Sequence, residues 1–388
     1  MGRMKEYLME IDVRKFQDIN KYVCEDCVQD FYLKKWIHNS SDRTRKCDYC
    51  GKKKETVLMT DLMNEIIMPT INGYYSLAVD ELGYDSAEGG YQGETYDKEE
   101  VLSSFSEYIS QNNQLINDIE DSLSDDIWCR GNPYGLSELE TYEYSWHHFS
   151  ELVKHKNRYF FLNEETNDKY DELYSPLLIL NSICDVVEKH HLIKTLPKNT
   201  NLYRARAFEK EKTIINGANL GSPPNKSAPN NRMNAAGISV FYASEDQMIC
   251  IKEIQNPKSN RNIVVGNFQN INAIRYLDLT EIRNIQLPSI FNLEERHIRN
   301  AIIFLKELNE ELTKPITSLK EIEYVPTQIF AEYFKIVVGL NGIKYNSSKD
   351  KNGTCFVLFF DNEQCINDKD KPIYNKKCEL KLISYISK

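Results

Sequence analysis

The chain has 388 residues, of which 41% are hydrophobic and 27% are charged, a composition typical of a globular protein with two or three domains. Its first 15 residues are charged and lack the apolar core of a signal peptide, and no apolar run approaches the ~18 residues that span a bilayer. We therefore expect a cytoplasmic protein without membrane association, whose ten cysteines do not form a disulfide framework.

The net charge of −10 is unevenly distributed. Residues 1–197 carry 21 basic and 37 acidic side chains, whereas residues 198–388 carry 27 and 21. The stretch 80–143 holds 17 acidic side chains against 2 basic ones, which would repel nucleic acid. Although six basic side chains lie over 43–54, this acidity argues against a nucleic-acid partner. The basic C-terminal half suits an anionic small molecule, although surface charge for solubility is an equally good interpretation.

Two CxxC pairs, Cys24 with Cys27 and Cys47 with Cys50, are separated by nineteen residues. Each pair can turn two thiolates toward one metal ion, and two pairs complete a tetrahedron. Four sulfur ligands leave no open position for water. The spacing therefore predicts a structural Zn²⁺ ion in a knuckle over residues 1–60, with one short helix. Two unrelated CxxC pairs and redox dithiols are the alternative interpretations.

The following segment, 61–195, is predicted to form a helical domain. Apolar spacing over 60–68 predicts a helix that Pro69 stops, and the glycine-rich stretch 83–96 predicts a loop. Asp97 and Glu100 form a capping pair for a helix whose apolar side includes Val101, Leu102, Phe105, Tyr108 and Ile109. Further helices are predicted over 113–123, 136–155 and 176–191.

The pattern changes after Pro197, where short β-rich runs alternate with helices, which predicts an α+β domain over 198–388. No GxGxxG motif opens a helix after a strand, so a Rossmann fold is excluded. Strands are predicted over 202–207, 238–243, 262–268, 274–279 and 354–360, and helices near 245–255, 294–311 and 327–335.

Two arginines of the predicted strand LYRAR, Arg204 and Arg206, precede a long polar loop over 220–237 that contains Arg232. Strand alternation places Arg204 on the face opposite Tyr203. Long polar loops inside ordered domains are typically functional or disordered, and guanidinium groups match the geometry of a pyrophosphate. A surface salt bridge remains the alternative for each single arginine.

Glu253 lies on a predicted helix that Ser244 caps, on or beside its buried side. A carboxylate there is costly unless it is paired or functional. Ser347 and Ser348 come shortly before a turn at Asn352-Gly353. A partly exposed helix glutamate and two turn serines are the alternative interpretation.

Together these segments resemble the RES family, named for its Arg, Glu and Ser. The motifs that carry the resemblance are LYRAR, GSPP…NRMNAAG followed by FYAS, KEI, EYVPTQIFAEY and GIKYNSS…FVLF, in family order over about 200–360. Asn231 departs from the pattern, because the family more commonly has glycine before Arg-Met-Asn. The N-terminal half resembles, more loosely, the HEPN/RES N-terminal domain.

The resemblance implies an ADP-ribosyltransferase-like fold for 198–388 and degradation of NAD+, as a glycohydrolase or as a phosphorylase with phosphate as co-substrate. It implies Arg204, Glu253 and Ser347 as catalytic residues. Glu253 would stabilise the oxocarbenium-like ribosyl cation, while the arginines would hold the phosphates. The substrate-binding residues inferred beside them are Tyr203, Arg206, Arg232, Tyr242 and Ser348.

By the same resemblance the protein is a toxin or phage-defence effector with an antitoxin or trigger protein as partner, and a homo-oligomer stays open. Transfer of ADP-ribose to a macromolecule and a non-enzymatic zinc adaptor are the alternative functions. Ribonuclease activity of the kind found in HEPN domains is not expected, because none of the seven histidines follows an arginine by four to six residues.

Overall fold

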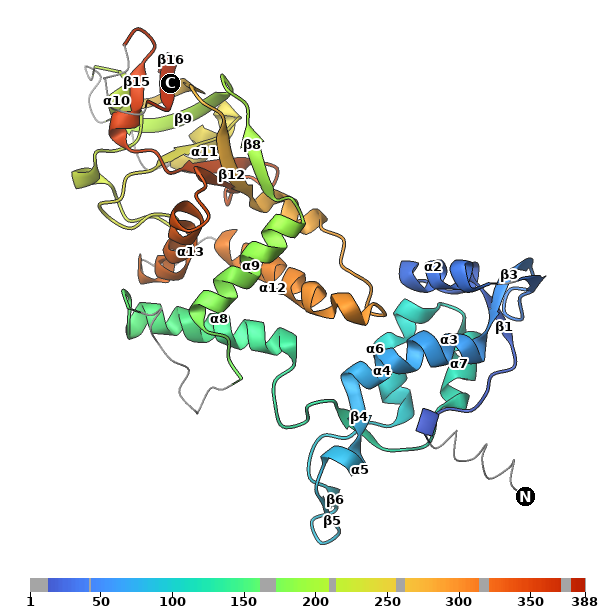
Figure 1. The fold of residues 1–388 in the computed structure, drawn as a ribbon. Coiled ribbons are helices and arrows are strands. Elements are labelled where there is room, and N and C mark those ends of the chain that lie inside the picture. Colours follow the sequence, from blue (N-terminus) through green and yellow to red (C-terminus); the bar gives the residue numbers. More distant parts are fainter. Residues whose placement is uncertain are drawn as a thin grey trace, which may run out of the picture. The chain divides into compact units, whose positions relative to one another are not determined.

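The computed structural model describes residues 13–41, 43–160, 172–208, 214–255, 262–313, 321–370 and 378–387 (Figure 1). Contacts divide the chain into unit 1, Met1–Glu140 with Leu287–Asn300, and unit 2, Thr141–Gln286 with Ala301–Lys388. The boundaries of these units differ from those of the predicted domains 1–60, 61–195 and 198–388. That division into three domains stays a prediction.

Unit 1 begins with a small antiparallel sheet and one helix. The sheet has the order β1-β3-β2, and its elements are β1 (Tyr22–Cys24), β2 (Arg43–Lys46) and β3 (Lys53–Leu58). The helix is α2 (Phe31–Ser40), whose N-terminus is capped by the Asp30 carboxylate through the Tyr32 amide at 2.7 Å. The short helix predicted for this region is therefore present as α2, beside a 3₁₀ turn at Glu25–Cys27.

A helical run follows from Met59 to Tyr74, made of α3 (Met59–Leu62), a π-helical turn (Met63–Ile67) and α4 (Met68–Tyr74). The prediction that Pro69 stops the helix is wrong. Pro69 lies in the first turn of α4, a position that tolerates proline, and the π turn changes the backbone pairing directly before it.

The acidic part of unit 1 holds two amphipathic helices, α6 (Lys98–Ile109) and α7 (Asn113–Ser122). The predicted capping box of Asp97 and Glu100 is present at the start of α6. Tyr108 was placed on the apolar side of α6 but is 40% exposed, so that assignment is wrong. The stretch 83–96 is mostly loop, with a two-residue hairpin of β5 (Tyr84–Asp85) and β6 (Gly90–Tyr91).

A segment from the C-terminal half of the sequence completes unit 1. Phe291 is buried in the same core as Phe105 and Trp128. The Ser289 hydroxyl donates to the Asp30 carboxylate at 2.7 Å, and the Arg296 guanidinium stacks 4.1 Å from the centre of the Tyr74 ring. The core of unit 1 therefore depends on Phe291, which lies 163 to 275 positions after the other members of that core.

Unit 2 contains two sheets that share one core. The first has the order β10-β14-β13-β12-β8 and the second the order β15-β16-β11-β9. Phe241 of the first sheet packs edge-on against Phe268 of the second, with ring centres 5.0 Å apart. The strands are β8 (Ile193–Leu196), β9 (Asn201–Phe208), β10 (Phe241–Ala243), β11 (Asn262–Asn270), β12 (Ile274–Asp278), β13 (Gly342–Asn346), β14 (Thr354–Leu358), β15 (Cys365–Asn367) and β16 (Leu380–Ser387).

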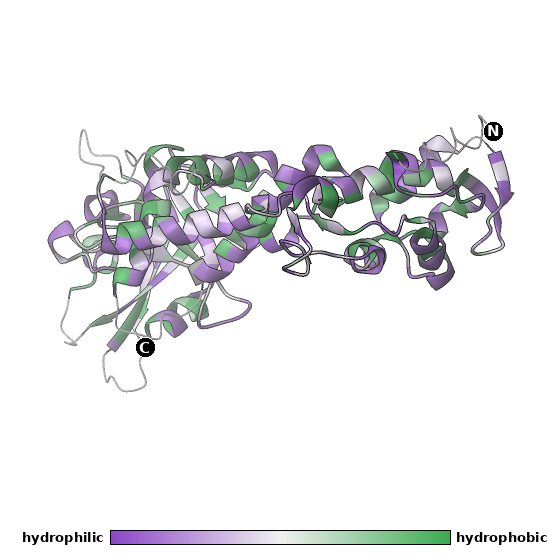
Figure 2. Ribbon diagram, turned by 90° about the horizontal axis from the view of Figure 1, so that it is seen from below, coloured by the Kyte–Doolittle hydropathy of each residue, from purple (hydrophilic) through white to green (hydrophobic). Residues whose placement is uncertain are grey.

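The helices of unit 2 include α9 (Pro176–Lys189), α11 (Gln247–Ile254) and α13 (Val325–Ile336), together with all but the first residues of α8 (Glu138–His155) and α12 (Arg296–Thr313), which begin in unit 1. Hydrophobic and hydrophilic residues alternate around many of the helices, as in helices that pack by one side (Figure 2). No helix among the described residues is long and apolar enough to cross a bilayer. The mixed α+β class is as predicted.

Candidate functional site

Helix α11 brings Glu253 toward the first sheet from its C-terminal turn. The helix begins after Asp246, whose carboxylate accepts a hydrogen bond from the Met248 amide at 2.7 Å. The predicted cap, Ser244, is wrong: its hydroxyl donates to the Thr354 carbonyl at 2.7 Å, because Ser244 is still part of a β-bridge. The segment between β10 and α11 is therefore tied to the first residue of β14.

Glu253 and Ser347 are in direct contact. The Ser347 hydroxyl donates a short hydrogen bond to the Glu253 carboxylate. The same hydroxyl oxygen accepts the Lys349 and Asp350 amides at 3.1 and 3.2 Å, so its proton points to Glu253. The Cys355 thiol lies 3.7 Å from the same carboxylate oxygen. The turn after β13 thus fixes the orientation of the carboxylate.

Two tyrosines face this pair from the first sheet. Tyr345 is paired with Cys355 and Tyr242 with Val357, and because strand side chains alternate, all four lie on one face. Burial raises the pKa of the Tyr345 phenol well above its ordinary value, so the phenol stays protonated and can donate. Tyr345 is absent from the predicted site residues. Its position two residues before Ser347 could have indicated that both side chains lie on the same face.

Arg232 supplies positive charge near the same face. Its guanidinium lies 5.9 Å from the centre of the Tyr324 ring and donates to the Glu311 carbonyl at 3.2 Å. Burial lowers the pKa of Arg232, and the negative charge of the Glu253 carboxylate opposes that shift. Arg232 lines a cavity of about 290 Å³ beside Tyr324.

Arg204 is held by the fold itself. Its Nε and Nη1 atoms donate to the carbonyls of Leu220 and Tyr242 at 3.1 and 2.8 Å, and its guanidinium lies 5.3 Å from the centre of the Phe241 ring. Burial lowers its pKa to about 10, so it remains cationic at neutral pH. Arg204 thereby connects β9 with the loop after it and with β10.

Arg204 and Arg206 share a cavity of about 230 Å³ with Asn231, Asn234 and Tyr242. Arg206 donates to the Asn219 carbonyl at 2.6 Å. Two guanidinium groups at one small cavity favour an anionic ligand.

Tyr203 and Ser348 are placed differently from the other predicted residues. Tyr203 packs against an apolar cluster that includes Cys250 and Val265, on the side of β9 opposite Arg204, as strand alternation predicts. Ser348 is exposed. The structure thus gathers Glu253, Ser347, Tyr242 and Arg232 around one face, with Arg204 and Arg206 at the adjacent cavity.

The polar loop over 220–237 is held internally by Asn234, which is 4% exposed. Its side-chain amide donates to the carbonyls of Pro229 and Ile238, both at 2.9 Å. Its side-chain oxygen accepts the Tyr242 hydroxyl at 2.9 Å. Asn234 therefore links the shape of the loop to a tyrosine of the site.

Helix α13 holds the same loop from outside through Gln328. Its side-chain amide donates to the Asn230 side-chain oxygen at 2.7 Å and to the carbonyls of Asn231 and Asn234 at 2.8 and 3.1 Å. Neither Gln328 nor Asn234 is among the predicted residues. A buried polar loop needs such partners for its backbone, but its sequence does not say which helix supplies them.

The four cysteines of the knuckle come together in unit 1. All four sulfur atoms lie within 4.8 Å of one another, with neighbouring Sγ atoms 3.6 to 3.7 Å apart. A tetrahedron with Zn–S bonds of about 2.3 Å has edges of about 3.8 Å. Three of the thiols are buried and Cys50 is partly exposed. The cluster therefore fits a closed tetrahedral zinc site.

Comparison with known proteins agrees with the sequence motifs. The family model HEPN/RES N-terminal domain 1 matches residues 40–167, and the model RES domain matches residues 201–380. No curated protein matches the chain. A solved structure, described as the M. tuberculosis MbcT-MbcA toxin-antitoxin complex, is 10% identical with a TM-score of 0.28, over 53% of this chain and 91% of that chain. A TM-score this low supports no conclusion about fold or function. By its two matched domains, the chain is a RES-family protein with a HEPN/RES-type N-terminal domain.

Proposed function

We propose that unit 2 cleaves NAD+ at the bond between nicotinamide and ribose and passes the ADP-ribosyl group to water or phosphate. The observation that carries this proposal is the Glu253 carboxylate, oriented by the Ser347 hydroxyl and close to Tyr345 and the positive charge of Arg232. The RES-domain match supports an enzyme that acts on NAD+. The ADP-ribosyltransferase-like fold implied by the resemblance stays a prediction.

In this reaction the C–N bond breaks and neutral nicotinamide leaves with the bonding electron pair. The remaining ribosyl group has oxocarbenium character, which a nearby carboxylate stabilises. Water then adds at the anomeric carbon and loses a proton, or phosphate adds instead. In our assignment Glu253 stabilises the cation, Ser347 fixes the carboxylate, and Arg204, Arg206 and Arg232 hold the phosphates.

The proposal is tested by incubating the purified full-length protein with NAD+, with and without phosphate, and separating the products. We expect nicotinamide together with ADP-ribose, or with ADP-ribose phosphate if phosphate is the acceptor. Intact NAD+ after prolonged incubation at micromolar enzyme would contradict the proposal. Label from NAD+ that remains on a macromolecule would favour the alternative, transfer of ADP-ribose to that macromolecule.

We also propose that cytoplasmic NAD+ depletion makes the protein a toxin or phage-defence effector that an antitoxin or trigger protein controls. Induced expression of the wild type should lower cellular NAD+ and arrest growth, while Glu253→Gln at equal abundance should do neither. Growth arrest by both proteins with unchanged NAD+ would show that the toxicity has another cause.

For the cysteine cluster we propose structural Zn²⁺, held by Cys24, Cys27, Cys47 and Cys50. Protein purified without chelator should contain about one zinc ion per chain. Cys47→Ser should lose the metal and lower the unfolding temperature of unit 1, because structural zinc binds with about 10–16 kcal/mol of apparent free energy. The buried Cys129 lies outside the cluster, so Cys129→Ser is the control for a buried hydroxyl. Wild-type protein without zinc by metal analysis would contradict this site.

A further inference from the structure

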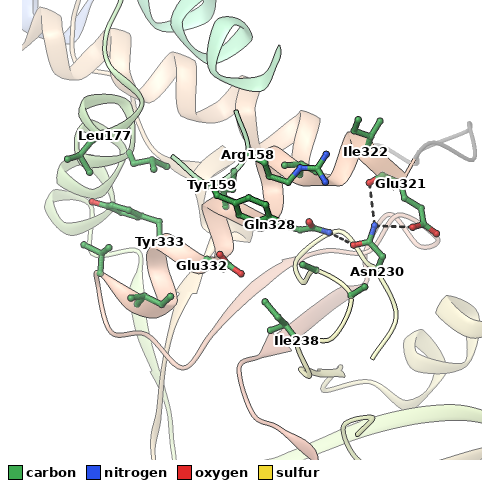
Figure 3. Close-up of a pocket in the computed structure, with 17 residues that line it drawn as sticks. Arg158, Tyr159, Leu177, Asn230, Ile238, Glu321, Ile322, Gln328, Glu332 and Tyr333 are labelled. Atoms are coloured by element: carbon green, nitrogen blue, oxygen red, sulfur yellow. Dashed lines mark hydrogen bonds between the residues drawn. The ribbon is translucent and has the colours of Figure 1, made fainter. Parts of the chain in front are cut away.

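A large groove lies in unit 2 behind the polar loop, bordered by α9, α13 and residues 230–238 (Figure 3). Its volume is about 890 Å³, several times that of either arginine-lined cavity. Most of its lining is apolar, from side chains such as Leu177, Ile238, Val325, Ile329, Tyr333 and Ile336. None of the residues assigned above to NAD+ cleavage lines it.

The lining from α13 forms one stripe along the helix. Val325, Ile329, Tyr333 and Ile336 follow one another at intervals of four, four and three residues, which places them on one side of the helix. The stripe is about 17 Å long at 1.5 Å per residue. It is the pattern of a helix that packs by one side. Val325 and Tyr333 are buried, and the Tyr333 hydroxyl donates to the Asn181 side chain of α9 at 2.7 Å, whereas at the C-terminal end of the stripe Ile336 is 73% and Val337 65% exposed.

The charges on the groove indicate which kind of helix fits. Two carboxylates, Glu321 and Glu332, lie on its lining, with Arg158 as the lining arginine (Figure 3). The Arg158 guanidinium donates to the backbone carbonyls of Val153 and Lys154, both at 3.4 Å. Two carboxylates against one guanidinium leave the lining with a net negative charge, which favours an occupant that carries basic side chains next to its apolar ones.

Gln328 connects this groove to the proposed active site. It lines the groove and donates to Asn230, Asn231 and Asn234 of the polar loop. Asn234 in turn accepts the Tyr242 hydroxyl. A helix bound in the groove would contact the side of α13 that carries Gln328, and Gln328 donates the hydrogen bonds that hold the loop.

We propose that this groove is a regulatory docking site for an amphipathic helix of a partner protein, with lysine or arginine beside its apolar side chains, and that Gln328 passes the effect of docking to the loop of Arg232. This is the helix-in-groove mode of recognition. A second copy of the chain fits less well, because a two-fold interface would bring the acidic groove against itself. The regulatory part rests on the proposed NAD+ cleavage; the docking part does not.

Docking is tested with two fluorescent synthetic peptides of about 18 residues, about five helical turns, one made of leucine and lysine and one of leucine and glutamate. The full-length protein should bind the lysine peptide at least tenfold more tightly by anisotropy. Ile336→Asp with Val337→Asp should weaken that binding about tenfold or more, while Val79→Asp, at a side chain 66% exposed in unit 1, should not. Glu321→Lys with Glu332→Lys should reverse the preference.

Equal binding of both peptides, or binding that the groove variants leave unchanged, would overturn the docking site. If the wild type is instead a dimer that Ile336→Asp with Val337→Asp dissociates, the groove belongs to a second copy and the proposal is wrong. Thermal melting of each variant shows whether it is folded.

The role of Gln328 is tested by hydrogen–deuterium exchange, which does not depend on activity. The lysine peptide should change the exchange of amides over 229–238 in the wild type. In Gln328→Met, which keeps the length of the side chain but not its donor, the peptide should still bind and the change should disappear. Asn230→Ala, which removes one partly buried acceptor of Gln328, should reduce the change in part. An undiminished response in Gln328→Met would contradict this route, and failure of NAD+ cleavage alone would leave this result intact.

Discussion

Replacing Glu253 with glutamine is expected to lower kcat for NAD+ cleavage by about 100-fold or more while the protein stays folded. Glutamine keeps the shape of the side chain and an oxygen that can still accept the Ser347 hydroxyl, but it lacks the negative charge. The charge acts mainly in the transition state, where the ribosyl group is cationic, so KM should change little.

Steady-state kinetics and thermal melting of Glu253→Gln check this expectation. Glu281→Gln is a matched control, because Glu281 is an exposed glutamate of unit 2 outside the site. If Glu253→Gln turns over NAD+ at close to the wild-type rate, Glu253 is only a partly buried helix glutamate that Ser347 satisfies. In that case the catalytic assignment fails, even though the family assignment stands.

Replacing Arg204 with alanine is expected to weaken both substrate binding and the fold. The change leaves the buried carbonyls of Leu220 and Tyr242 without their donor, and each unmet acceptor costs about 1–3 kcal/mol. With the cavity that forms beside Phe241, we expect a loss of about 3 kcal/mol or more in the free energy of unfolding. KM for NAD+ should rise, because the pyrophosphate is present in the ground state.

Urea unfolding and steady-state kinetics separate the two effects. Arg206→Ala is the matched control: Arg206 lies on the same side of β9, but among the described residues it donates to one carbonyl, that of Asn219. It should raise KM with a smaller loss of stability. A variant Arg204→Ala with wild-type stability and raised KM would show that the arginine binds substrate without supporting the fold.

Much of this architecture could be predicted from local sequence. The motif order identified the RES family, which the two domain matches confirm. The capping box at α6 depends on residues three positions apart, so local spacing was sufficient. Strand alternation placed Arg204 and Tyr203 on opposite sides of β9, because that geometry is fixed within a few residues.

The parts that could not be predicted depend on contacts between distant residues. Gln328 reaches a loop almost a hundred positions earlier, and nothing in the α13 sequence names its acceptors. The hydrogen-bond partners of Arg204 could not be predicted either, because they are backbone carbonyls and every residue has one. The prediction that Pro69 ends the helix was wrong because proline is tolerated in the first turn of a helical segment, and the start of α4 could not be located from the sequence. Strands β8 and β15 are too short for a periodic signal.

The segment Leu287–Asn300 has a consequence for how such proteins can be recombined. It lies within the stretch matched by the RES domain, yet Phe291 fills the core of unit 1. A crossover at the sequence junction near Pro197 would separate Phe291 from the core that it completes. If the N-terminal half were fused to a different RES domain, the core of unit 1 would lack Phe291 unless the new domain carried an equivalent side chain at that position. Substitutions at Phe291 and at the core residues of the N-terminal half that surround it must therefore be compatible with one another, although the two halves match different family models.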